Sequence, residues 1–288
     1  MSNSTSPVLV IGATGRIGRA VVSELRRAGA PVRALSRQPA TGSSTQGVES
    51  VAGDLTVPES LDAALRDVRV VFLVWIAGPN SMPDVVARFA RSVERVVFLS
   101  SPHQTPHPFF QQPNAMGTLH ADIEHALAAA GLAPTLIRPG MLSANAVEWW
   151  ADEIGAGDVV RWPYAAAETA PIDERDIAAV AARALCDPAH AGKDYVITGP
   201  DALTHADQVR ILGDALGRRL RLDELTPDEF RRESASRWPA PVVEMLLSAW
   251  GATMGHAAYV TSTVADVTGA PAHTFGDWAT ANADRFRP

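Results

Sequence analysis

The feature that most constrains the fold is a short apolar run followed by a glycine-punctuated turn. Residues Val8 to Ile11 are all apolar, and they lead into Gly12-Ala13-Thr14-Gly15-Arg16-Ile17-Gly18. Beyond the turn, apolar residues recur at helical spacing, at Ile17, Val21, Leu25 and Ala28. This stretch predicts a buried parallel strand, a tight turn and an amphipathic helix.

Each glycine of this turn has a physical function. One glycine allows the sharp turn out of the strand, one lets backbone N–H groups approach a ligand, and one lets the helix pack closely on the sheet. The unpaired N–H groups of the helix N-terminus then converge on one point, which suits a pyrophosphate. We therefore predict a dinucleotide site formed by Gly12, Thr14, Gly15, Arg16, Ile17 and Gly18.

The rest of the first half alternates strands and helices. Apolar runs predict strands at 32–36, 48–52, 70–75, 95–100 and 135–138. Helices are predicted at 84–92 and 116–130, and a capping box at Thr56-Val57-Pro58-Glu59 predicts a helix through Asp67. Such alternation is typical of a parallel sheet with right-handed crossovers.

Beyond about residue 145 the alternation loosens. Helices are predicted at 176–186, 206–216, 241–254 and 275–286, strands at 195–198 and 220–222, and helix caps at Thr204 and Thr226. We therefore predict an α/β fold with two domains. A Rossmann-type doubly wound parallel sheet occupies residues 1–145, and a smaller mixed α/β lobe occupies residues 146–288, from which some segments return to the sheet domain.

Composition excludes several classes of protein. A hydrophobic share of 47% suits a globular core, and the single cysteine, Cys186, permits neither a disulfide framework nor a thiolate metal site. His103 and His107 are four residues apart, but the prolines around them prevent a helix, so no metal site is expected. The net charge of −7 disfavours nucleic acid, and no signal peptide or membrane span is recognisable, so we expect a cytoplasmic protein.

The end of the second predicted strand indicates which nucleotide binds. A carboxylate there binds the ribose 2′-hydroxyl, whereas an arginine accommodates a 2′-phosphate. The chain has Ser36 and Arg37 at this place and no acid, which predicts NADP(H). Asp54 ends the third strand and is placed to accept from the adenine amino group. Two alternatives remain: Arg37 is only a loop arginine, and Asp54 only caps its turn.

An ordered set of motifs resembles the atypical short-chain dehydrogenases of the NmrA-like family, which includes quinone and dye reductases and NADP-sensing regulators. The motifs are Gly12–Gly18, Arg37, Gly53-Asp54-Leu55, Thr135–Gly140, Ile172–Ala178 and Val267–Pro271. They cover essentially the whole chain. The resemblance implies that adenine lies near Asp54 and Leu55, and that nicotinamide lies near Val74, Trp75, Ser100 and Pro139.

One departure from the family bears on the chemistry. Short-chain dehydrogenases usually carry Tyr-x-x-x-Lys on the helix after the fifth strand, and the alignment puts Met116 and His120 at these positions. Met116 cannot transfer a proton, so the usual carbonyl reduction is not expected. His120 remains a candidate acid or ribose ligand, with Ser101 as a second candidate catalytic residue. The alternatives are a partly exposed helix histidine and an ordinary turn serine.

Large aromatic residues are frequent in the second half. Because ligands of this architecture bind between the strand ends and the extra lobe, we predict substrate contacts from four residues: His103, Met141, Trp149 and Trp162. For the tryptophans, the alternative is the core of the lobe or a partner surface. For His103, the alternative is a solvated loop histidine.

The favoured interpretation is an NADPH-dependent oxidoreductase acting on a quinone-like or aromatic, polyketide-like small molecule. A quinone delocalises the charge that it acquires with a hydride, so it depends less on a tyrosine proton donor. Two alternatives stay open: a noncatalytic NADP(H)-sensing regulatory protein, and a biosynthetic tailoring enzyme that couples or isomerises without net hydride transfer. The expected partner is the small-molecule substrate, without nucleic acid or membrane, and a homodimer is left open.

Overall fold

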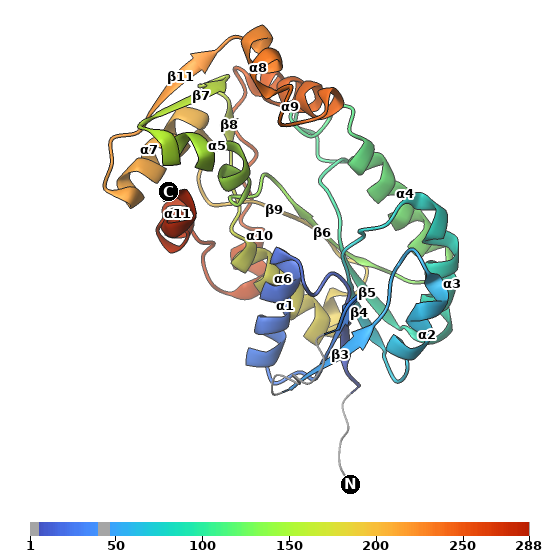
Figure 1. Ribbon diagram of the computed structural model, residues 1–288. Helices are drawn as coiled ribbons and strands as arrows, with labels where there is room; N and C mark the ends of the chain where they lie inside the picture. Colours follow the sequence, from blue (N-terminus) through green and yellow to red (C-terminus); the bar gives the residue numbers. More distant parts are fainter. Residues whose placement is uncertain (1–5, 40–46, 288) are drawn as a thin grey trace. The chain divides into compact units, whose positions relative to one another are not determined.

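The computed structural model describes residues 6–39 and 47–287 (Figure 1). Two compact units can be distinguished. Unit 1 comprises Met1–Ser101, Met116–Arg138 and Glu174–Tyr195, and unit 2 comprises Pro102–Ala115, Pro139–Asp173 and Val196–Pro288. The predicted boundary near residue 145 does not coincide with this division, because the chain passes repeatedly from one unit to the other.

A seven-stranded sheet with the order β3-β2-β1-β4-β5-β6-β9 organises unit 1. Its strands are β1 Val8–Val10, β2 Val32–Ser36, β3 Val48–Ala52, β4 Val70–Leu73, β5 Arg95–Leu99, β6 Thr135–Pro139 and β9 Asp194–Ile197. β1 pairs in parallel with both β2 and β4, so the strand order reverses beside β1. This is the predicted doubly wound Rossmann-type arrangement, which is confirmed.

Helices cover both faces of this sheet. α1 (Arg16–Arg27) and α6 (Glu174–Cys186) contact each other, as Figure 1 shows, and α6 also contacts β4 and β5. On the other face, α2 (Leu61–Ala64), α3 (Met82–Ser92) and α4 (Ala115–Ala129) bury apolar side chains against the strands. The shared core includes Leu9, Ile11, Leu61, Phe89, Phe98 and Ile123. Burial on both faces explains why the strands are apolar throughout.

The capping box predicted at Thr56 is wrong. Both the backbone N–H and the hydroxyl of Thr56 donate to Asp54 Oδ1 at 2.8 Å, so this hydroxyl does not cap a helix. In place of one helix through Asp67, the chain forms a 3₁₀ turn at Pro58–Ser60 and the short α2. Asp67 has φ of 59° and lies beyond that helix. The Asp54 carboxylate, two residues upstream, therefore binds the Thr56 hydroxyl that the sequence assigned to the helix cap.

Unit 2 contains two small sheets and most of the remaining helices. β7 (Val159–Pro163) pairs in parallel with β11 (Arg221–Leu225), and β8 (Glu168–Thr169) pairs antiparallel with β10 (Leu203–Thr204). The helices are α5 Asn145–Ala156, α7 His205–Leu216, α8 Pro227–Ser234, α9 Ala240–Thr253, α10 Thr263–Thr268 and α11 Phe275–Ala281. The sequence had not predicted α5, α10, β7, β8 or β10, because two are very short and α5 lacks a side-chain cap.

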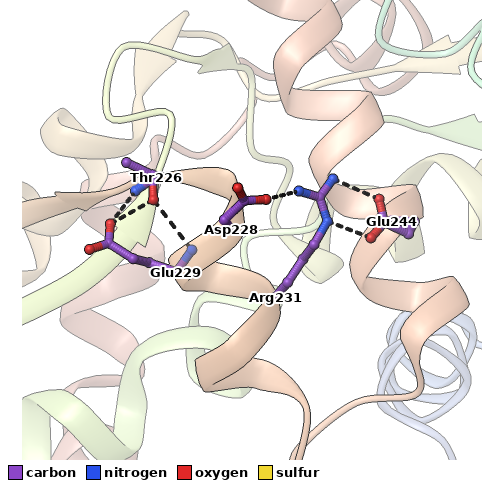
Figure 2. Close-up of polar contacts among 5 residues, drawn as sticks. All are labelled: Thr226, Asp228, Glu229, Arg231 and Glu244. Atoms are coloured by element: carbon purple, nitrogen blue, oxygen red, sulfur yellow. Dashed lines mark hydrogen bonds and ion pairs between the residues drawn. The ribbon is translucent and has the colours of Figure 1, made fainter.

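Local capping chemistry in unit 2 agrees with the sequence. Thr204 and Thr226 both form the capping boxes that were predicted, and Gly217 ends α7 in the left-handed conformation with φ of 67°. Figure 2 shows the second box, in which Thr226 and Glu229 exchange hydrogen bonds. The hydrogen bonds from Thr226 lower the pKa of the Glu229 carboxyl.

An exposed arginine links α8 to α9. Arg231 donates from Nε and Nη2 to the two carboxylate oxygens of Glu244, at 2.6 and 2.9 Å, and from Nη1 to Asp228 at 2.7 Å (Figure 2). The guanidinium lowers the pKa of the Glu244 carboxyl, chiefly through these hydrogen bonds. The fork geometry fixes the relative position of the two helices.

No helix in the described part of the chain is long and apolar enough to cross a membrane.

Candidate nucleotide-binding site

The glycine turn of unit 1 accepts only glycine at two positions. Gly12 has φ of +83°, and a Cβ there would lie 2.9 Å from the Val74 Cβ. A Cβ on Gly18 would lie 2.0 Å from the carbonyl oxygen of Gly12, which is backbone and cannot move aside. Gly15 N–H closes the turn on the same oxygen at 2.9 Å. The turn therefore holds its tight shape only with these glycines.

This turn presents the N-terminus of α1. Gly15 is the N-cap residue and has no side chain that could accept from the first helical N–H groups, and the first turn contains no acidic residue. Thr14 and Gly15 are exposed. Backbone donors and the positive end of the helix dipole thus meet at an open surface, which suits an anion. The residues present fit the diphosphate of a dinucleotide.

The arginines predicted for the cofactor differ in their surroundings. The Nε of Arg16 lies 3.7 Å from Oε1 of Glu174 at the start of α6, so Arg16 already forms an ion pair with a carboxylate. Arg37 is exposed beside Asp54. The Thr56 N–H and hydroxyl, with a smaller contribution from Arg37, lower the pKa of the Asp54 carboxyl. Asp54 therefore caps its own turn, and its contact with adenine stays a prediction.

A hollow of about 420 Å³ adjoins the turn within unit 1. It is lined by residues of the turn, α1, β2 and β3, among them Thr14, Arg19, Arg26, Ser36 and Gln38, and its described lining contains no carboxylate. Ser36 Oγ donates to the Gln38 carbonyl at 3.1 Å and accepts from the Gln38 N–H at 3.2 Å. The resulting turn from Ser36 to Gln38 shapes the end of β2 next to Arg37. The lining favours a negatively charged ligand.

Three predicted contacts near the strand ends are apolar. Leu55 and Trp75 have exposed fractions of 2% and 5% and belong to the core of unit 1, whereas Val74 is half-buried and packs against Gly12. The Trp75 Nε1 is buried without a hydrogen-bond partner among the described residues. The side chains of Leu55 and Trp75 therefore belong to the core of unit 1 and not to an exposed surface.

A buried polar network surrounds Ser100, at the carboxyl end of β5. The Ser100 hydroxyl donates to Glu124 Oε1 in a short hydrogen bond, and Arg138 Nη2 donates to Glu124 Oε2 at 2.8 Å. Arg138 also donates to the Ser101 carbonyl at 2.8 Å and to Asp194 Oδ1 at 2.7 Å. Ser100, Glu124 and Arg138 are all buried. The guanidinium compensates the buried carboxylate, which otherwise would be very costly to desolvate.

This network fixes the direction of the Ser100 hydroxyl. Since its proton points to Glu124, its oxygen lone pairs are available only for accepting. Sequence reasoning named Ser100 and Ser101 but missed Glu124 and Arg138 as functional residues. One signal was present: Glu124 follows His120 by four residues, so both lie on the same face of α4.

The α4 residues aligned with the usual Tyr and Lys differ in burial. Met116 is 52% exposed, while His120 is half-buried with its ring edge-on to Phe98 at a centroid distance of 5.4 Å. His120 thus stands one helical turn before Glu124, and its ring lies against β5.

The residues predicted for the substrate lie in unit 2. Met141 lines a hollow there, together with His107, Phe110 and Tyr259. Trp149 and Trp162 are 7% and 2% exposed and pack in the core of unit 2, which is the alternative left open for them. The loop residue His103 accepts at its carbonyl from Gln111 at 3.3 Å, and Pro139 ends β6. Within residues 6–39 and 47–287, no three His, Cys, Asp or Glu side chains are grouped to hold a metal ion.

The fold and the glycine turn together define a dinucleotide-binding protein of the Rossmann type. Residues 4–268 match the model of the NmrA-like family. The chain therefore belongs to the NmrA-like family, as the resemblance of its motifs implied.

Known relatives cover nearly the whole chain. A (4-alkanoyl-5-oxo-2,5-dihydrofuran-3-yl)methyl phosphate reductase from Streptomyces griseus is 38% identical over 98% of this chain and 99% of the relative. An NAD(P)H azoreductase from Xenophilus azovorans is 31% identical over 97% and 99%. The crystal structure of an NADPH-dependent quinone oxidoreductase from Escherichia coli superposes with a TM-score of 0.80, at 23% identity, over 95% of this chain and 98% of that one.

Proposed function

We propose that this chain, an NAD(P)H-dependent oxidoreductase, uses NADPH to reduce a small conjugated acceptor such as a quinone, an azo compound or an acyl-substituted unsaturated lactone. The observation that carries the proposal is the glycine turn, in which Gly12 and Gly18 leave no room for a Cβ beside an uncapped helix N-terminus. The activities of the two sequence relatives support it, since both are reductases of conjugated compounds.

The cofactor would be held by backbone more than by side chains. The first N–H groups of α1 bind the diphosphate, because Gly15 provides no competing cap. Arg37, exposed at the end of β2, binds the 2′-phosphate, with Ser36 shaping the turn beside it. Bound at the carboxyl ends of the strands, NADPH supplies a hydride equivalent.

Ser100 acts as an oriented acceptor at the end of β5. Glu124 Oε1 accepts the hydrogen bond that the Ser100 hydroxyl donates, so the lone pairs of the hydroxyl oxygen are offered to an N–H or O–H donor of the bound cofactor. Arg138 donates to Glu124 Oε2 and to the carbonyl of Ser101, so it holds both groups in place. We assign Glu124 and Arg138 as positioning residues for these two serines.

A conjugated acceptor explains the loss of the usual proton donor. Overall, the acceptor gains one hydride and one proton, which together amount to two electrons and two protons. Its negative charge spreads over the conjugated system, so the proton can come from water or from His120 without a tyrosine at position 116. Met116, which is 52% exposed and has no ionisable group, fits this chemistry.

The test is NADPH oxidation, followed at the nicotinamide absorbance band, with a naphthoquinone, an azo dye and an acyl-substituted unsaturated lactone. We expect turnover with at least one of the three, and loss of most of it in His120→Ala if His120 supplies the proton. NADPH binding without oxidation in any of these mixtures would contradict the proposal and favour the NADP(H)-sensing alternative. Turnover of a substrate without a change in absorbance would favour coupling or isomerisation.

A further inference from the structure

A second arginine, Arg19, borders the hollow beside the glycine turn of unit 1. Arg19 belongs to the first turn of α1, and helical side chains lean toward the helix N-terminus, which here begins at the N-cap residue Gly15. Arg19 lines the hollow together with Thr14 of the glycine turn and Ser36 of β2. The hollow measures about 420 Å³, whereas one water molecule occupies about 30 Å³, so a phosphate group has room there.

The elements around the hollow do not neutralise the charge of Arg19. α1 and β3 each contain one acidic residue, and β2 contains none. Glu24 of α1 forms an ion pair with Arg27, and Glu49 of β3 forms one with Arg33 at 2.8 Å. Neither carboxylate lines the hollow. Arg19 is exposed and has no ion-pair partner among residues 6–39 and 47–287, so its positive charge is available to a ligand.

Arg37 approaches the end of β2 from a different side. Ser36 and Gln38 line the hollow, but Arg37, which lies between them in the chain, does not. Hydrogen bonds from Thr56 and, to a smaller extent, the charge of Arg37 lower the pKa of the Asp54 carboxyl. The negative charge of Asp54 in turn offsets part of the charge of Arg37. Arg37 alone therefore attracts a phosphate group less strongly than an isolated arginine would.

We infer that Arg19 and Arg37 bind the 2′-phosphate of NADPH together, from two sides of the β2 end, and that Arg19 is a specificity-determining residue for NADPH over NADH. The inference rests on the proposed function. A 2′-phosphate carries a charge of about −1.5 to −2, which two guanidinium groups match. Neither arginine suffices, because Asp54 repels the same phosphate. Without Arg37 this repulsion cancels the attraction to Arg19, and without Arg19 the remaining Arg37 and Asp54 have almost no net charge.

The experiment is a calorimetric titration with NADPH and with NADH, at one ionic strength, of wild type, Arg19→Gln and Arg19→Lys. We expect Arg19→Gln to lower the preference for NADPH by about tenfold and to leave the affinity for NADH within about twofold of wild type, because only the 2′-phosphate loses a partner. Arg19→Lys keeps the charge and should keep most of the preference. Arg91→Gln removes an exposed arginine from α3, on the other face of the sheet, and as the matched control should leave both affinities unchanged.

A double variant tests whether the two arginines act together. Arg19→Gln combined with Arg37→Gln should lower the preference for NADPH little further than either substitution alone, since each alone already removes most of it. Thermal melting of each variant checks the fold. A preference for NADPH that survives Arg19→Gln overturns the inference. An equal loss of affinity for NADPH and NADH in Arg19→Gln also overturns it, because the side chain would then support the turn and not the 2′-phosphate.

Two fragments of the cofactor separate this inference from the proposed reductase function. Adenosine 2′,5′-bisphosphate and adenosine 5′-monophosphate differ only in the 2′-phosphate, and neither can transfer hydride. If the bisphosphate binds more tightly to wild type and loses this advantage in Arg19→Gln, but no acceptor is reduced, the assignment of Arg19 stands and the reductase function fails. If acceptors are reduced and the advantage of the bisphosphate is absent or survives Arg19→Gln, the reductase function stands and the assignment of Arg19 fails.

Discussion

A charged network in unit 1 and an aromatic cluster in unit 2 both bury polar side-chain atoms, but the two clusters surround these atoms differently. In unit 1, Glu124 and Arg138 are buried with hydrogen bonds to each other and to Ser100. In unit 2, the Nε1 atoms of three core tryptophans, Trp150, Trp162 and Trp250, are buried without a hydrogen-bond partner in the described part of the chain, and so is His205 Nε2.

The difference indicates two uses of buried polarity. The unit 1 network lies at the end of a central strand and orients a hydroxyl where the fold binds its ligand, so its charges are matched. The unit 2 cluster is an aromatic core, with rings of Trp150, Trp162, Trp250 and Phe230 in mutual contact and His205 packed against two of them. There the polar atoms are accepted as a consequence of packing large rings.

The largest expected effect comes from breaking the matched network. Glu124→Ala removes the buried carboxylate partner of Arg138 and leaves this guanidinium the exposed Asp194, so it should lower the free energy of unfolding by about 3–4 kcal/mol. Denaturant titration measures this loss. Glu94→Ala, which removes an exposed partner of Arg69, is the control and should change stability by less than about 1 kcal/mol. Equal losses of unfolding free energy in the two variants would show that the buried ion pair contributes no more to stability than the exposed one.

A second variant tests the glycine turn of unit 1. Gly18→Ala places a Cβ against the Gly12 carbonyl, so we expect a loss of about 3 kcal/mol and a matching loss of NADPH affinity. Gly155→Ala in α5 is the matched control in unit 2, because a Cβ there meets nothing within 4 Å and alanine favours a helix. It should leave stability unchanged or slightly raised. Normal NADPH binding by Gly18→Ala would contradict the assigned site.

The aromatic core of unit 2 should be sensitive to acid through His205. Burial lowers the pKa of His205 from 6.5 to about 4. The unfolded chain therefore takes up a proton near pH 6.5 while the folded chain resists until about pH 4. The contribution of neutral His205 to the free energy of unfolding is fully present above pH 6.5. It falls as the pH drops toward 4, by at most about 3 kcal/mol.

Denaturant titrations at pH 7 and pH 4.5 measure this dependence. His205→Phe should remove most of it, whereas His256→Gln, at an exposed position, should not. An identical pH dependence in wild type and His205→Phe would show that other groups govern the acid transition.

The smallest effect concerns a helix cap. Thr226→Ala removes the hydroxyl that accepts from Glu229 N–H at 3.3 Å, and it should cost about 1 kcal/mol, measured by thermal or denaturant unfolding (Figure 2). Thr226→Ser keeps a capping hydroxyl and should retain most of the stability that Thr226→Ala loses. Failure of serine to restore it would assign the effect to the lost methyl group.

Local chemistry explains what the sequence predicted correctly. The glycine turn, the apolar strands and the capping boxes at Thr204 and Thr226 depend on neighbours within a few residues, so they are legible in the chain. Ser100, Glu124 and Arg138 come from three separate elements, and only the fold brings them together. Trp149 and Trp162 illustrate a further limit, since an aromatic residue looks the same in a pocket wall and in a core.

The measurement that tests the central claim most directly is calorimetric titration of the purified chain with NADPH and NADH, for wild type and Arg37→Gln. We predict that the wild type binds NADPH more tightly by about 10- to 100-fold and that Arg37→Gln reduces this preference to about unity. No binding of either nucleotide, or equal affinities in the wild type, would contradict the account.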